Sequence, residues 1–214
     1  MPSQVKMIAV SKTKPVEDII QVYHAGQRLF GENKAQELRE KQALLPQDIE
    51  WHFIGHLQSN KIKYIAPFVS LIHSIDSFKL LQEVNKHAAK VQRTIPCLLQ
   101  FHIATEESKF GFSMDECETM LRDKHFGTLN NINIQGVMGM ATFTENVELI
   151  RSEFRILHTY STYLKENYFN KENSFKEISM GMTDDYGMAI EEGSTMVRIG
   201  SAIFGERNYP ISSK

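Results

Sequence analysis

The sequence predicts an α/β fold in which eight parallel β-strands alternate with α-helices and close into a single (β/α)8 barrel. Eight short runs rich in β-branched or other apolar residues recur along the chain, with room for a helix between successive runs. An open doubly wound sheet is the alternative. However, the first strand runs into Ser11-Lys-Thr-Lys-Pro15 without the glycines of a dinucleotide-binding turn, and no G-x-x-x-x-G-K-[ST] loop is present. No stretch is rich enough in Gly, Pro or Ser to act as a linker, so we expect one domain over residues 1–214.

The strands and helices can be placed in order along the chain. The predicted strands occupy residues 5–10, 28–31, 50–55, 69–75, 94–103, 132–140, 175–180 and 195–203. Three apolar stripes with helical spacing lie between them, namely Val16, Ile19, Ile20 and Tyr23 behind Pro15, then Leu81, Val84, Ala88 and Val91, then Val147, Ile150, Phe154 and Leu157. Two capping boxes, Ser113-Met-Asp-Glu116 and Thr142-Phe-Thr-Glu145, predict the first turns of helices.

The composition narrows the classes of function. Lys and Arg number 24 against 26 Asp and Glu, so the chain lacks the basic excess that binds nucleic-acid phosphates. No apolar stretch approaches the roughly 18 residues of a membrane helix, and the first ten residues lack a signal-peptide pattern. Two cysteines, Cys97 and Cys117, are too few for a disulfide framework and suit a reducing compartment, and Cys97 is expected in the core. We therefore expect a cytoplasmic protein that binds neither nucleic acid nor membrane.

Lys12 is the first candidate functional residue, because the active face of such a barrel lies at the carboxyl ends of its strands. Lys12 shares its parity with Ile8 and Val10, so the three side chains are expected on one face of the first strand. Desolvation at the mouth of an apolar barrel disfavours the ammonium form, and a neutral amine is what Schiff-base formation with an aldehyde needs. Taken alone, the position is more typical of a solvated lysine at a strand end.

The ends of the seventh and eighth strands predict an anion site. Gly181-Met182-Thr183 leads into Asp184-Asp185, which we interpret as the first turn of a helix, and Gly200-Ser201 ends the last strand. Glycines allow close approach of the backbone, and hydroxyls with the free N–H groups of a helix start bind phosphate. Glycine turns with capping hydroxyls are the alternative. Together with Lys12, the two loops suit a phosphorylated aldehyde, of which pyridoxal phosphate is the obvious cofactor.

Arg198 is the only charged residue between Thr195 and Ile203, and a buried guanidinium needs a partner. One interpretation places it against a pyridine nitrogen. Since arginine only donates, the ring would stay unprotonated and be a weak electron sink. An ion pair with a core carboxylate and an outward-facing charge are the alternatives. His52 and His56 are four residues apart on a strand and its following loop, so we expect no metal site there.

Several segments resemble the family of pyridoxal phosphate homeostasis proteins, which are similar to the barrel domain of alanine racemase standing alone. These segments run in order along the chain and are Ala9-Val-Ser-Lys-Thr-Lys-Pro15, Phe30-Gly-Glu-Asn33, Trp51-His-Phe-Ile-Gly-His-Leu-Gln-Ser-Asn-Lys61, Lys109-Phe-Gly111, Gly136-Val-Met-Gly-Met140, Ser179-Met-Gly-Met-Thr-Asp-Asp185 and Gly193-Ser-Thr-Met-Val-Arg-Ile-Gly-Ser-Ala-Ile-Phe-Gly-Glu-Arg207. The resemblance implies a single barrel of the alanine racemase N-terminal-domain type that binds pyridoxal 5′-phosphate.

The resemblance also implies roles for individual residues. Lys12 would carry the cofactor as an internal aldimine, Arg198 would face the ring nitrogen, and Asn33 would line the pocket. The phosphate would be held by the remaining residues of the expected site, which are Gly181, Met182, Thr183, Gly200 and Ser201. Two positions depart from the family but keep a hydroxyl. Thr183 stands where we expect serine, and Ser201 stands where we expect threonine. A third is larger, because a helix usually precedes the first strand and only Met1–Gln4 does so here, so that we expect this helix to be missing or trimmed.

Two functions are compared on this basis. A homeostasis protein holds pyridoxal phosphate on the lysine, limits the free aldehyde and passes it to apo-enzymes. An amino-acid racemase needs an acid/base on each face of the substrate α-carbon, and in alanine racemase the second comes from a β-rich domain. This chain ends eleven residues after Ile203, and Tyr186 offers no obvious replacement. We therefore expect a monomeric binding protein rather than an enzyme.

Overall fold

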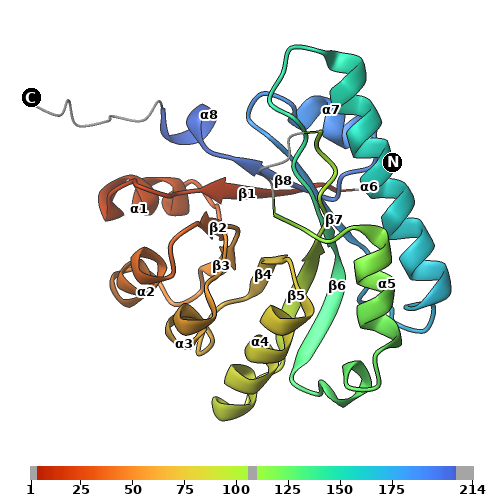
Figure 1. Cartoon of the computed structure of the whole chain (residues 1–214). Coiled ribbons are helices and arrows are strands. Elements are labelled where there is room, and N and C mark those ends of the chain that lie inside the picture. The colour runs from red at the N-terminus through yellow and green to blue at the C-terminus, as the bar shows by residue number, and fades with distance from the viewer. Residues whose placement is uncertain (1–3, 106–109, 206–214) are drawn as a thin grey trace, which may run out of the picture.

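The fold is a closed barrel of eight parallel strands, shown by a computed structural model that describes residues 4–105 and 110–205 (Figure 1). The strands pair in chain order, and β1 pairs with β8 as well as with β2, which closes the sheet. They are β1 (Lys6–Val10), β2 (Leu29–Glu32), β3 (Glu50–Phe53), β4 (Leu71–Ile75), β5 (Ile95–Gln100), β6 (Ile132–Met138), β7 (Glu177–Met182) and β8 (Met196–Ile199). The predicted (β/α)8 barrel is confirmed, and the open sheet is excluded.

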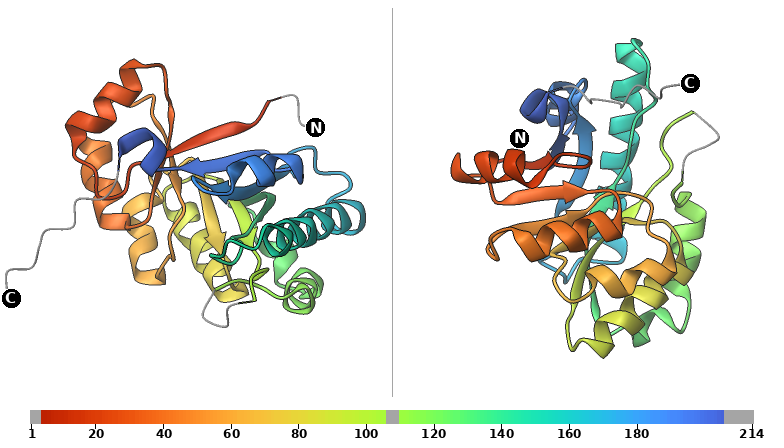
Figure 2. Two further views of the ribbon diagram at one scale, coloured as in Figure 1. Left: turned by 90° about the horizontal axis from the view of Figure 1, so that it is seen from above. Right: turned by 90° about the vertical axis from the view of Figure 1, so that its left-hand side faces the viewer.

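Helices surround this barrel on the outside, and α8 lies beside α1 (Figure 2). The helices are α1 (Val16–His24), α2 (Ala35–Leu44), α3 (Ile62–Ile65), α4 (Phe78–Lys90), α5 (Met114–Arg122), α6 (Val147–Asn167), α7 (Tyr186–Glu191) and α8 (Ser201–Phe204), with 3-10 turns η1 (Ser59–Lys61) and η2 (Phe126–Thr128). The three predicted apolar stripes lie on α1, α4 and α6, with Val91 just beyond the end of α4. In the described parts of the chain, no helix has the length and apolar character to cross a membrane.

Alternating strand residues contribute to two separate apolar layers. The main core lies between the strands and the helices and includes Phe30 and Trp51 against Leu38 of α2. Inside the barrel, a much smaller cluster consists of Leu71, Leu98, Met138 and Met196. Buried polar side chains also lie inside the barrel, among them His52, His73, Ser179 and Arg198, and they form part of the site described below.

Both cysteines are buried, and Cys97 lies on β5 in the main core as predicted. Burial raises the pKa of both thiols, that of Cys117 to about 12. Thiols with pKa values this high are protonated and unreactive at neutral pH.

Two predicted helix starts differ from the structure. The Ser113 capping box is present at α5, but the Thr142 box is wrong because α6 begins at Val147 behind Asn146, whose side chain accepts from the Leu149 N–H. Thr142 instead donates to Glu153 at 2.7 Å, a carboxylate that is only 2% exposed. The expected first turn at Asp184–Asp185 is also wrong, since Asp185 precedes α7.

Candidate functional site

Lys12 lies in the turn that follows β1, at the carboxyl end of the strand. Ile8 and Val10 are buried. A Cβ added at Gly31 of β2 would contact Ile8, and one added at Gly200, just after β8, would contact Val10. The strand ends at Val10, so the alternation of side chains along β1 includes Ile8 and Val10. Lys12 belongs to the turn that follows and is half-buried. Thr13, the next residue, has a positive φ of 65°, which marks a sharp change of chain direction beside the lysine.

The ends of β7 and β8 are tied together by Thr183. Its hydroxyl oxygen accepts from the Gly200 N–H at 3.3 Å, so the two predicted phosphate loops lie side by side. Gly181 has a φ of +93°, and a Cβ there would approach the Ala189 Cβ to 2.6 Å, so the turn requires glycine. Ser201 is exposed at the first position of α8, where backbone N–H groups have no acceptor within the helix.

The Met182 N–H, one of the expected phosphate donors, already has an acceptor. It donates to Asp185 Oδ1 at 2.5 Å. Burial raises the pKa of this carboxyl, while its bond from Met182 and the nearby Arg198 charge lower it. A phosphate on this loop therefore either displaces Asp185 from Met182 or is held by the donors around Thr183, Gly200 and Ser201.

Arg198 points into the barrel and is 4% exposed. Its Nη1 donates to the carbonyl and hydroxyl oxygens of Ser179, at 2.8 and 2.6 Å, and its Nη2 donates to the Gly139 carbonyl at 3.0 Å. Among the described residues, no carboxylate lies within ion-pairing distance of it, so neither alternative considered from the sequence, a core ion pair or an outward charge, is observed. Burial lowers its pKa to about 10, which leaves the guanidinium charged at neutral pH.

Two buried histidines continue the hydrogen bonds of Arg198 across the barrel. Ser179 Oγ lies 2.9 Å from His73 Nδ1, and His73 Nε2 lies 2.8 Å from His52 Nδ1. Burial lowers the pKa of both rings, that of His52 to about 3, so both are neutral at neutral pH. Because arginine only donates, Ser179 accepts from Arg198, and its own proton has His73 Nδ1 as acceptor. His73 then donates from Nε2 to His52 Nδ1.

The predicted role of Asn33 has a structural counterpart. Its Oδ1 atom is buried without a hydrogen-bond partner in residues 4–105 and 110–205, which is typical of a group awaiting a ligand or water. Asn33 also lines a cavity of about 310 Å³ at the ends of β2 and β3, together with Phe53 and His56. Gly55 makes this corner possible, because a Cβ there would come within 2.3 Å of the Asn33 carbonyl oxygen.

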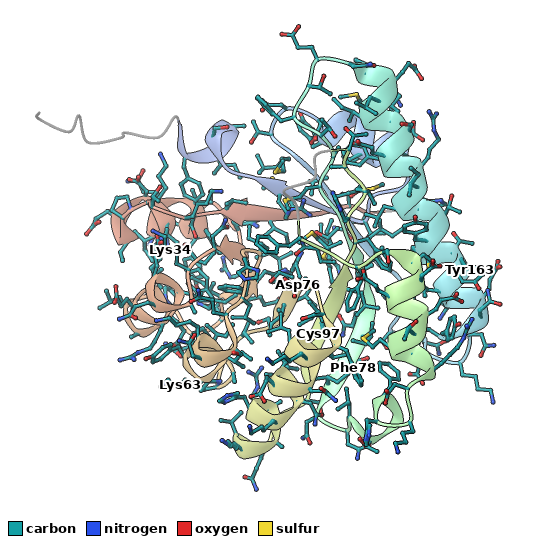
Figure 3. All side chains as sticks on the ribbon, in the orientation of Figure 1. Lys34, Lys63, Asp76, Phe78, Cys97 and Tyr163 are labelled. Carbon is teal, nitrogen blue, oxygen red and sulfur yellow. The ribbon has the colours of Figure 1, made fainter. Side chains whose placement is uncertain are left out.

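The two histidines that are four residues apart in sequence have different surroundings. His52 lies inside the barrel, whereas His56 pairs with Asp76 at 3.2 Å and stacks on Phe110 at 4.3 Å between ring centroids. Asp76 follows β4 (Figure 3). Across residues 4–105 and 110–205, no group of three or more His, Cys, Asp or Glu side chains is arranged to hold a metal ion.

Some residues of this site were missed by the sequence reasoning. His73 and Ser179 are polar positions on strands β4 and β7 that are otherwise apolar, and this was the available signal. Asp185 was interpreted as a helix residue and not as an acceptor. Lys109 and Arg207, the ends of two matching segments, lie outside the described residues.

Comparison with known proteins gives a consistent result. Residues 1–208 match the family described as alanine racemase, N-terminal domain. Relatives named pyridoxal phosphate homeostasis protein include that of Aquifex aeolicus, 38% identical over 205 residues (95% of this chain, 88% of the relative). That of Pasteurella multocida is 40% identical over 210 residues (97% and 88%), and that of Homo sapiens is 37% identical over 221 residues (96% and 78%).

Solved structures agree with these matches. PipY of Synechococcus elongatus, solved with PLP bound, is 32% identical with a TM-score of 0.84, covering 96% of this chain and 94% of PipY. The same protein without PLP gives a TM-score of 0.88. Alanine racemase from Bartonella henselae, with covalently bound pyridoxal phosphate, is 14% identical with a TM-score of 0.69, covering 98% of this chain and 60% of the racemase, and shows the shared fold alone.

Proposed function

Because this chain belongs to the pyridoxal phosphate homeostasis proteins, whose fold is that of the alanine racemase N-terminal domain, we propose that it binds pyridoxal 5′-phosphate. In this proposal Lys12 holds the cofactor covalently as a Schiff base. The protein buffers the reactive aldehyde and delivers it to apo-enzymes. PipY, at 32% identity, is solved with PLP bound, which supports the ligand.

The observation that carries the proposal is the set of groups around the ends of β1, β2, β7 and β8. Among the described residues, the buried guanidinium of Arg198 has only neutral oxygen acceptors, and the buried Asn33 side-chain oxygen has no partner. Hydroxyls of Thr183 and Ser201 flank Gly200, where a Cβ would meet nothing closer than Val10 at 3.5 Å. A phosphorylated pyridine aldehyde fits this combination of an amine, hydroxyls and a buried donor.

Each of these residues has a defined task in the proposal. Lys12 supplies the amine that condenses with the aldehyde carbon, releasing water. Thr183, Gly200 and Ser201 hold the phosphate, with the backbone of Gly181 and Met182. Arg198 donates to the ring nitrogen and keeps a proton away from it. When bound, the cofactor supplies an aldehyde and a ring that can accept electrons. Arg198 weakens the second property, since an unprotonated pyridine is a poor electron sink.

A racemase is the second candidate, and it needs a second acid/base opposite Lys12. Tyr186, at the start of α7, is 46% exposed, and no contact of its hydroxyl with a described residue points to such a role. The relatives above carry the name of homeostasis proteins. We therefore favour binding and delivery over turnover, by a monomer in the cytoplasm, where the two buried thiols stay reduced.

Borohydride reduction tests the covalent step. The purified protein is incubated with pyridoxal 5′-phosphate, reduced and digested, and the pyridoxyl group is located by mass spectrometry. We expect it on Lys12, and the Lys12→Ala variant should lack both the label and the yellow colour of the loaded protein. Labelling of Lys14 or Lys61 in place of Lys12 would overturn the assignment.

A further inference from the structure

The turn that carries Lys12 is held in an unusual conformation by charged side chains behind it. Thr13 has a φ of 65°, a region that L-residues rarely adopt and that persists only where the surroundings enforce it. Residues on both sides of Lys12 are therefore constrained, and the groups that constrain them lie on β2 and α2.

Three side chains make these contacts, and we call Glu32, Glu37 and Lys41 the anchoring triad. Glu37 Oε1 accepts from the Thr13 N–H at 2.6 Å. Lys41 Nζ donates to the Ser11 carbonyl at 2.8 Å, and Glu32 Oε1 accepts from the Ser11 hydroxyl at 2.6 Å. The triad is connected within itself, because Lys41 Nζ lies 2.7 Å from both carboxylates.

The burial of the triad shows that stability alone does not explain it. The side chains of Glu32 and Lys41 are 0% and 8% exposed, beneath α2, which begins just after Lys34 in Figure 3. Burial raises the pKa of Glu32 although Lys41 lies beside it, and Glu32 Oε2 has no hydrogen-bond partner. A buried ion pair is often no more stable than apolar residues of the same volume, whereas the directed hydrogen bonds of this triad hold Ser11 and Thr13 in place.

The same turn is tied to the other side of the site by Lys14. Its Nζ donates to the carbonyls of Phe204 and Gly205, at 2.6 and 3.2 Å. These carbonyls end α8, the helix that starts at the proposed phosphate residue Ser201. The turn is thus held by α2 on one side and by α8 on the other, with Lys12 between the two attachments.

We propose that Glu32, Glu37 and Lys41 are positioning residues that hold the turn so that the Lys12 amine meets the cofactor aldehyde. The proposal rests on the proposed function, in which Lys12 forms the Schiff base. The triad acts through the backbone of Ser11 and Thr13 and through the Ser11 hydroxyl, so its loss affects covalent attachment and leaves the phosphate residues in place.

The test separates attachment from binding. Attachment is measured as the rate of colour development after mixing with pyridoxal 5′-phosphate, and as the mass of the borohydride-reduced protein. Binding is measured with pyridoxine 5′-phosphate, which has the ring and phosphate but an alcohol in place of the aldehyde. We expect Lys41→Met to slow attachment by about tenfold to a hundredfold, the scale of a small misplacement of a reacting group. Its affinity for pyridoxine 5′-phosphate should stay unchanged.

Two further comparisons control for general damage. Arg39→Met removes a cation from an exposed position of the same helix and should change neither measurement. Glu37→Gln keeps an oxygen for the Thr13 N–H and should retain attachment, whereas Glu37→Leu should slow it. Glu37 is more exposed than Lys41, so the two Glu37 variants test the positioning role even if Lys41→Met fails to fold.

The outcomes distinguish this inference from the proposed function. Unchanged attachment in Lys41→Met and Glu37→Leu would overturn the positioning role, as would an equal weakening of both ligands. Failure of the unsubstituted protein to attach pyridoxal 5′-phosphate at Lys12 would instead overturn the proposed function.

Discussion

Replacing Ser179 by alanine removes the hydroxyl that connects the buried arginine with the buried histidines. The hydroxyl is 2.6 Å from Arg198 Nη1 and 2.9 Å from His73 Nδ1, and the residue is 0% exposed. A hydrogen bond to a charged group contributes about 1.5–3 kcal/mol and a neutral one about 1 kcal/mol, so the free energy of unfolding should fall by roughly 2–4 kcal/mol. Arg198 keeps its bonds to the Ser179 and Gly139 carbonyls, which limits the loss.

Ser194→Ala is the matched control, because Ser194 is as completely buried as Ser179. Within the described parts of the chain, the acceptors of its hydroxyl are backbone carbonyls, those of Met180 and Met196 at 2.8 and 2.9 Å among them. The loss there should be about 1 kcal/mol, as for a neutral hydrogen bond.

Urea unfolding measures the difference between the two variants. Trp51 is the single tryptophan, lies in the main core and reports on unfolding by fluorescence, with circular dichroism as the second probe of a two-state transition. At a slope of roughly 2–3 kcal/mol per M urea, Ser179→Ala should shift the midpoint by about 1 M. Equal midpoints for the two serine variants would refute the argument that Ser179 satisfies a buried charge.

Three further predictions concern pH, phosphate and catalysis. The pKa of His52 is lowered to about 3 and that of His73 lies well below its usual value, so the folded protein resists protonation of both. The contribution of the two neutral histidines to the free energy of unfolding is therefore fully present above pH 6.5. It falls as the pH drops below 6.5, by up to about 1.4 kcal/mol per pH unit for each histidine, because the unfolded chain takes up the protons. His52→Gln should lower this slope in urea titrations at successive pH values, and an unchanged slope would contradict the assignment. Thr183→Ala or Ser201→Ala alone should weaken pyridoxal 5′-phosphate binding by about 1–2 kcal/mol. Pyridoxal, which has no phosphate, should bind the unsubstituted protein much more weakly than pyridoxal 5′-phosphate does. Equal affinities for the two aldehydes would exclude a phosphate site. In deuterated water, L-alanine should exchange with the lysine-bound cofactor far faster than its α-proton is lost, and turnover near the ~10 s⁻¹ typical of enzymes would indicate a racemase.

The barrel was predictable from sequence because each strand is a local apolar run and three of the helices, α1, α4 and α6, show a local apolar stripe. Contacts between distant residues were not predictable in the same way. Thr142 matches a capping box, but in the folded chain its hydroxyl donates a hydrogen bond to the Glu153 carboxylate, eleven residues further on.

The same limit applies to the site. Lys12 and Arg198 stand out in sequence, one by its place at a strand end and the other as a single charge in an apolar run. Ser179 and His73 are 106 residues apart and meet only across the closed barrel. The anchoring triad was equally hidden, since Glu32 and Lys41 resemble an ordinary surface pair until α2 is folded onto β2.

The apolar residues inside the barrel and those outside it form separate clusters, and this separation bears on how the family can diversify. Truncating a large residue of the outer core, such as Trp51, leaves a cavity and costs about 3–5 kcal/mol. The inner cluster has four residues, of which Met138 and Met196 are unbranched thioethers that adapt to a changed neighbour. Exchanges of similar volume there are tolerated at about 1 kcal/mol. Exchanges of similar volume within this inner cluster therefore draw little on the stability held by the outer layer, so the apolar part of the interior can change while the barrel stays folded.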